Sequence, residues 1–160
     1  MIKTDNDIVH WLDQMTDKPY YLGDPSKGWD CLNSILCLYR QFGYEFPTEI
    51  DGWTEDNYAS LWEKDPVAGR KILSKLYERV GEEVQPNFYE PWDLMIFGSN
   101  KTPDIAAIYL GSGNIRMVFE DGVKDVPFHA LEKHLKFVRR LRKNEIEKMG
   151  RSENDEGCRL

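Results

Sequence analysis

The stretch DKPYYLGDPSKGWDCLNSILCLYRQFGYEFP, residues 17–47, is the part of the chain that decides the expected fold. Its first third carries two prolines and Gly23, so it is predicted to be a loop. A helix ended by Gly43 is predicted over residues 30–42, because apolar side chains recur there at helical spacing: Leu32, Ile35, Leu36, Tyr39 and Phe42. Cys31 therefore falls in the first turn of a helix, directly after a loop.

The position of Cys31 favours a nucleophilic thiol. A helix N-terminus supplies partial positive charge and backbone N–H groups, and both favour the thiolate that acts in covalent catalysis. A buried structural cysteine is the alternative interpretation, because Cys31 shares a helical stripe with Ile35 and Leu38. Cys37 lies on a different side of this helix, among polar residues, so we do not expect it to bind a metal together with Cys31.

The rest of the chain predicts an α+β fold, in which helices come first and a meandering sheet follows. Helices are predicted at residues 5–16, about 55–62 and 65–83, and strands at 93–97, 105–110, 115–120, 123–127 and 135–141. Hairpin turns are predicted at Gly111-Ser112-Gly113 and Asp121-Gly122. We expect one domain over residues 1–142, with an extended helical insertion at 48–90, and a flexible tail at 143–160.

Four ordered blocks carry a resemblance to a known family. They are Pro19-Tyr20-Tyr21-Leu22-Gly23, then Gly28-Trp29-Asp30-Cys31, then Trp92-Asp93-Leu94-Met95-Ile96-Phe97, then Ile105-Ala106-Ala107-Ile108-Tyr109-Leu110-Gly111. In this order they resemble the NlpC/P60 cysteine peptidases, which cleave peptidoglycan stem peptides. The resemblance implies a papain-like domain whose N-terminal helices pack on an antiparallel sheet. It also implies that Cys31 occupies the nucleophile position, with Tyr20, Tyr21, Trp29 and Asp30 as candidate binding residues.

The chain departs from this family at two catalytic positions. The general-base histidine of the family falls on Ile105, and its third, orienting polar residue falls on Met117. An imidazole takes the thiol proton and later protonates the leaving amine, and neither replacement can do so. The three histidines of the sequence are His10, His129 and His134, and the resemblance gives none of them a catalytic role.

Composition limits the partners and the compartment. The net charge is 21 minus 28, or −7, which argues against binding of nucleic acid. No run of 18 apolar residues exists, and the N-terminus lacks the apolar stretch of a signal peptide, so we expect no membrane association. The resemblance to the family, whose phage tail-associated members lack signal peptides, implies a location in a virion tail or the host cytoplasm. The three cysteines, Cys31, Cys37 and Cys158, form no metal-binding spacing, and no cofactor is expected.

The predicted function is that of a phage tail-associated or tail assembly protein, a catalytically degraded member with a structural or binding role. The long middle and the ending Val126-Pro127-Phe128-His129-Ala130-Leu131-Glu132-Lys133 resemble tail-associated members of the family. Aromatic residues in 53–92 are candidate anchors for a protein partner: Trp53, Trp62, Phe88, Tyr89 and Trp92. The main alternative is an active endopeptidase that uses Cys31 on peptidoglycan stem peptides. A thiol acyltransferase and a small acidic inhibitor are further alternatives.

Overall fold

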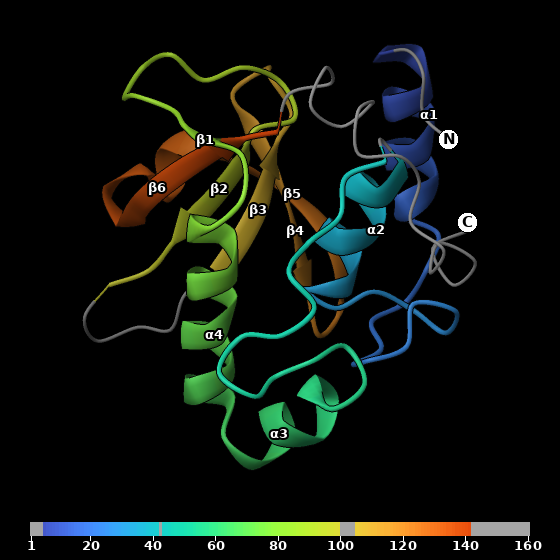
Figure 1. Ribbon diagram of the computed structural model, residues 1–160. Helices are drawn as coiled ribbons and strands as arrows, with labels where there is room; N and C mark the ends of the chain where they lie inside the picture. Colours follow the sequence, from blue (N-terminus) through green and yellow to red (C-terminus); the bar gives the residue numbers. More distant parts are fainter. Residues whose placement is uncertain (1–4, 42, 100–104, 142–160) are drawn as a thin grey trace. The chain divides into compact units, whose positions relative to one another are not determined.

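The computed structural model describes residues 5–41, 43–99 and 105–141, and these residues form two compact units (Figure 1). Unit 1 contains residues 5–41, 43–45, 118–124 and 141 of the described chain. Unit 2 contains residues 46–99, 105–117 and 125–140. The prediction of a single domain over 1–142 stays a prediction, and the tail predicted for 143–160 lies outside the described residues.

The helices of unit 1 are α1 (Asp5–Met15) and α2 (Asn33–Gln41). In α1 the buried side chains recur every three or four residues, which is the pattern of a helix that covers a core with one face: Ile8, Trp11, Leu12 and Met15. In α2 the apolar stripe is buried, and the polar residues Asn33, Ser34 and Arg40 are buried as well. Helix α2 is therefore an internal helix rather than a surface one.

The helices of unit 2 are α3 (Tyr58–Lys64) and α4 (Pro66–Glu78), joined at Asp65. The Asp65 carboxylate accepts the N–H of Ala68, and Pro66 occupies the first turn, so α4 begins with two common start signals. The helices pack closely at Gly69, where an added Cβ would lie 2.5 Å from the Trp62 ring. Figure 1 shows this pair as the green helices α3 and α4.

The helix predicted over 65–83 was too long. Gly81 has a positive φ of 62°, which a continuing helix does not allow. The Arg139 guanidinium binds the carbonyl oxygens of Val80 and Gly81 at 2.7 and 2.9 Å, so these groups are satisfied outside a helix. The chain then forms β1 (Glu82–Glu83), a strand that the sequence pattern did not predict.

The sheet has six strands in the order β1-β6-β2-β3-β4-β5. The other strands are β2 (Leu94–Phe97), β3 (Ile105–Tyr109), β4 (Asn114–Phe119), β5 (Gly122–Pro127) and β6 (Leu135–Arg140). Strand β2 pairs antiparallel with both β3 and β6, and every residue of it is buried. Two 3₁₀ turns, Phe128–Ala130 and Glu132–His134, connect β5 to β6. The predicted α+β fold with an antiparallel sheet is confirmed.

The two central strands, β2 and β3, carry no charged side chains, whereas each of the other four strands carries at least one. Arg116 on β4 makes two hydrogen bonds to the carboxylate of Asp125 on β5, at 2.7 and 3.0 Å, and these bonds link the two strands.

No helix in the described part of the chain is both long and apolar enough to span a membrane.

Candidate functional site

The first turn of α2 is organised by the side chain of Asp30, which is 1% exposed. One carboxylate oxygen accepts the backbone N–H groups of Leu32 and Asn33 at 2.8 and 2.6 Å, and the other accepts that of Gly23 at 2.8 Å. The Asn33 side chain in turn accepts the N–H of Asp30 at 2.8 Å. This is a reciprocal cap of the turn that leads into α2, and Cys31 lies in this turn, two residues before α2 begins at Asn33. The helix predicted from residue 30 therefore begins slightly later.

The loop before Asp30 is held against it by a close backbone contact at Gly28. A Cβ at that position would lie 2.3 Å from the carbonyl oxygen of Pro19, so only glycine fits. On either side of the contact, the N–H of Trp29 donates to the Pro19 carbonyl at 2.8 Å, and the N–H of Tyr21 donates to the Trp29 carbonyl at 3.1 Å. The Pro-Tyr and Gly-Trp parts of the motif therefore form one closed loop.

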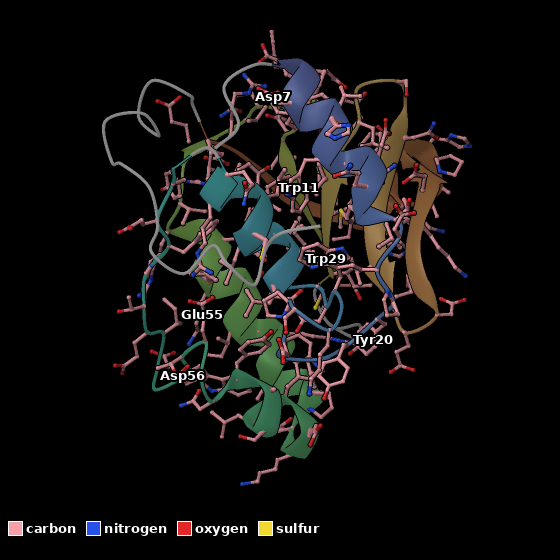
Figure 2. The ribbon with its side chains drawn as sticks, turned by 90° about the vertical axis from the view of Figure 1, so that its right-hand side faces the viewer. Asp7, Trp11, Tyr20, Trp29, Glu55 and Asp56 are labelled. Carbon is pink, nitrogen blue, oxygen red and sulfur yellow. The ribbon has the colours of Figure 1, made fainter. Side chains whose placement is uncertain are left out.

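Trp29 anchors this loop inside unit 1. Its side chain is fully buried, its ring packs at 5.5 Å from that of Trp11, and its indole N–H donates to the Met15 carbonyl at 3.0 Å. Figure 2 shows Trp11 on α1 and Trp29 as neighbours, with Tyr20 below Trp29, to which it is paired through the backbone. Trp29 thus joins α1 to the start of α2.

Two charged side chains, those of Lys18 and Asp24, make contacts that hold this loop. The Lys18 ammonium lies 4.3 Å above the Trp29 ring and donates to the Pro25 carbonyl at 2.7 Å. Burial lowers the pKa of Lys18, and the nearby charge of Asp24 partly opposes that shift. Hydrogen bonds from the side chain and backbone of Ser26 lower the pKa of Asp24.

Of the predicted binding residues, Tyr21 is exposed and Tyr20 is half-buried, whereas Trp29 and Asp30 are buried in contacts within unit 1. Lys27 lies over the Tyr21 ring at 5.0 Å, on the solvent side of the loop. The Cys31 side chain is half-buried and carries a thiol rather than a disulfide. The binding role of these four residues stays a prediction.

Ile105 and Met117, the positions predicted to correspond to the family's base and orienting residue, lie on one face of the sheet. Tyr109 on β3 pairs with Ile115 on β4, and residues two apart on a strand point to the same side. Ile105 and Met117 therefore share the face of Tyr109, on adjacent strands. Ile105 is half-buried and Met117 is buried, and both are apolar, so this face offers no proton acceptor at either position.

An aromatic cluster covers the same face. The Phe128 ring lies 5.6 to 6.2 Å from three other rings, those of Tyr89, Tyr109 and Phe97. Of the histidines, His129 and His134 lie in the two 3₁₀ turns of unit 2, and His10 lies on α1 in unit 1. Within the described ranges, no group of three histidine, cysteine or acidic side chains could hold a metal ion.

Sequence reasoning missed a buried ion pair beside this cluster. Asp93 is 1% exposed, and its carboxylate accepts two bonds from the Arg140 guanidinium, both at 2.9 Å. This pairing with Asp93 raises the pKa of Arg140. The sequence did contain a signal for this pair. Asp93 directly precedes an apolar strand, and a buried aspartate at such a position requires a cationic partner.

Comparison with known proteins identifies the fold. Models of known protein families give no match, and neither do curated proteins. Among solved structures, the crystal structure of the NlpC/p60 domain of the peptidoglycan hydrolase SagA matches with a TM-score of 0.56 and 21% identity, over 87% of this chain and 100% of that domain. At this identity the likeness concerns the fold, and it confirms the predicted papain-like, NlpC/P60-like architecture.

Proposed function

We propose that this chain is an NlpC/P60-like protein that has lost peptide hydrolysis and acts as a phage tail-associated or tail assembly component. The observation that carries the proposal is the apolar pair Ile105 and Met117, on adjacent strands and one face of the sheet. A cysteine peptidase needs a base to activate its thiol and an acid to protonate the leaving amine. Isoleucine and methionine supply neither.

The loop and helix motif around Cys31 is explained without catalysis. The Asp30 carboxylate binds three backbone N–H groups, Trp29 joins α1 to α2, and Gly28 permits a contact that no other residue allows. Loss of any of these would disturb the fold of unit 1. The motif can therefore persist in a protein whose role is structural.

An active endopeptidase that uses Cys31 on peptidoglycan stem peptides is the second candidate. It is favoured by the place of Cys31 in the capped turn that leads into α2, because the partial positive charge of a helix N-terminus favours a thiolate. It requires a base from outside the two expected positions, and His10, His129 or His134 would have to supply it.

The structural proposal is tested by assembly in the native host. The natural chain and Cys31→Ala should both co-purify with a larger particle and should support equal yields of infectious or assembled particles. Asp30→Ala, which disturbs the fold of unit 1, should reduce incorporation. Loss of particle function in Cys31→Ala with normal incorporation would favour the enzyme, and absence of the natural chain from every particle would contradict the structural role.

A further inference from the structure

Phe88 is the most exposed large apolar side chain of the described residues, at 71%. Among the other aromatics of the 53–92 stretch, Tyr58 and Tyr77 are buried, and Trp53, Trp62, Tyr89 and Trp92 are half-buried. An aromatic ring gains most from burial, since it removes 150–250 Å² from water. Phe88 is therefore the residue of this stretch that a partner could still cover.

The loop that carries Phe88 is held rigidly. Trp92 has a φ of 75°, a region that a bulky residue enters only when neighbouring contacts enforce it. The Trp92 N–H donates to the Tyr109 carbonyl at 2.7 Å. Arg140, already bound to Asp93, also donates to the Phe88 carbonyl at 2.8 Å. A ring on a fixed loop loses little conformational freedom when it binds.

An open strand edge lies next to this loop. Strand β1 is the first strand of the sheet order, and its Glu82 pairs with Arg140, the residue that binds the Phe88 carbonyl. The Val84 N–H donates to the Val138 carbonyl at 2.9 Å, so Val84 and Glu82 direct their backbone groups toward β6. The alternation of an antiparallel pair then directs the N–H and C=O of Glu83 away from the sheet, where an added strand could bind.

The charges around this edge are acidic. Glu82, Glu83 and Glu90 are exposed. Arg139 binds the carbonyls at the end of α4, and Arg140 binds Asp93 and also lies 3.4 Å from the Glu90 carboxylate, so the two arginines are outnumbered by Asp93 and the three glutamates. The whole chain has a net charge of −7, so a second copy would be repelled, and nucleic acid would be repelled as well.

We propose that Phe88, Glu82, Glu83 and Glu90, here called the acidic edge, bind an extended basic segment of another protein. The segment adds a strand beside Glu83, places lysine or arginine side chains against the glutamates, and covers the Phe88 ring with an apolar side chain. This inference rests on the proposed function for its biological setting, because it names the chemistry of the partner in the assembly.

The probe is a short synthetic peptide of alternating lysine and valine with a central leucine, and its matched control has glutamate in place of lysine. Titrated into the ¹⁵N-labelled full chain, the basic peptide should shift the amide signals of residues 82–90 and of β6. Phe88→Ala should weaken binding about tenfold or more. The double change Glu82→Lys, Glu83→Lys should reverse the preference toward the acidic peptide. Val67→Ala, at another exposed apolar residue, is the matched control and should leave binding unchanged.

Three results would overturn the acidic edge. They are no binding of the basic peptide at residues 82–90, equal binding after Phe88→Ala, or equal binding of the two peptides. Self-association of the chain through these residues would overturn the partner class. These failures are separate from failure of the proposed function, because the acidic edge contains no residue of the Cys31 motif. Stem-peptide hydrolysis would end the structural proposal even if the peptide binds.

Discussion

Asp30 and Asn33 cap helix α2 reciprocally: the Asp30 carboxylate accepts the Asn33 N–H at 2.6 Å, and the Asn33 side chain accepts the Asp30 N–H at 2.8 Å. The same carboxylate binds the N–H of Gly23, seven residues earlier. One side chain therefore fixes both the helix start and the loop before it. Because Cys31 lies between these bonded groups, the Asp30 cap fixes the backbone on both sides of it.

Asp30→Ala should lower the free energy of unfolding by about 3 kcal/mol, because it removes the acceptor for several backbone N–H groups at once. Asp30→Asn should lose less, since it keeps one acceptor oxygen. Urea unfolding measures both. Asp17→Ala, at an exposed aspartate at the start of the same loop, is the control and should stay within about 0.5 kcal/mol of the natural chain. A loss of similar size in the control would refute the special role of Asp30.

Asp51 gives a prediction about acid stability. Its hydrogen bond to Lys75, at 2.7 Å, lowers its pKa. A carboxyl whose folded-state pKa is lowered contributes stability that is present above its unfolded pKa, about 3.9, and is lost as the pH falls through the folded value. Lys75→Met should raise the pKa of Asp51 toward its usual range and shrink this contribution. Titration of the carboxyl carbon by NMR measures the shift, and an unchanged titration would contradict the pairing.

The contact between α3 and α4 can be tested at Gly69. Alanine is favoured over glycine in a helix by about 1 kcal/mol, yet its Cβ would meet the Trp62 ring at 2.5 Å. Gly69→Ala should therefore destabilise the chain by about 1–3 kcal/mol. In a Trp62→Leu background the same change should become neutral or favourable. Thermal unfolding of the natural chain, the two single variants and the double variant measures the effect of Gly69→Ala in each background. Equal effects in both backgrounds would rule out the contact.

Ser74 on α4 offers a stabilising change. Its hydroxyl is buried and, within the described part of the chain, makes no hydrogen bond. Ser74→Ala removes the unsatisfied group and places a better helix former there, so the free energy of unfolding should rise by about 1 kcal/mol. Chemical denaturation tests this, and a loss of stability would mean that the hydroxyl has a bonding role.

Hydrophobic periodicity predicted most of the fold. It located α1 and α2, whose apolar side chains recur at helical spacing, and β-prone runs between turn residues located the strands from β2 to β6 to within a few residues. It failed at Glu82 and Glu83, which form β1 although both are exposed and charged. Their pairing depends on Arg139 and Arg140 of β6, more than fifty residues away, and local patterns carry no such information.

The candidate site was partly predictable. The place of Cys31 near a helix start, directly after a loop, followed from the sequence pattern, whereas the roles of Ile105 and Met117 could be assigned only through the family resemblance. The buried pair of Asp93 and Arg140 was missed because the arginine belongs to a basic run that resembles a solvated patch. The turn at Asp51-Gly52 was also missed, although aspartate before glycine is a strong hairpin signal and both residues have positive φ.

The central claim is that the chain does not hydrolyse peptidoglycan stem peptides. The most direct measurement compares product formation from purified stem peptides by the natural chain and by Cys31→Ala, with an active NlpC/P60 peptidase as the positive control. Because general acid–base catalysis contributes about 10²–10⁴-fold, a chain with apolar residues at both positions should show no turnover above Cys31→Ala. Turnover by the natural chain that disappears in Cys31→Ala would contradict the claim and establish the enzyme instead.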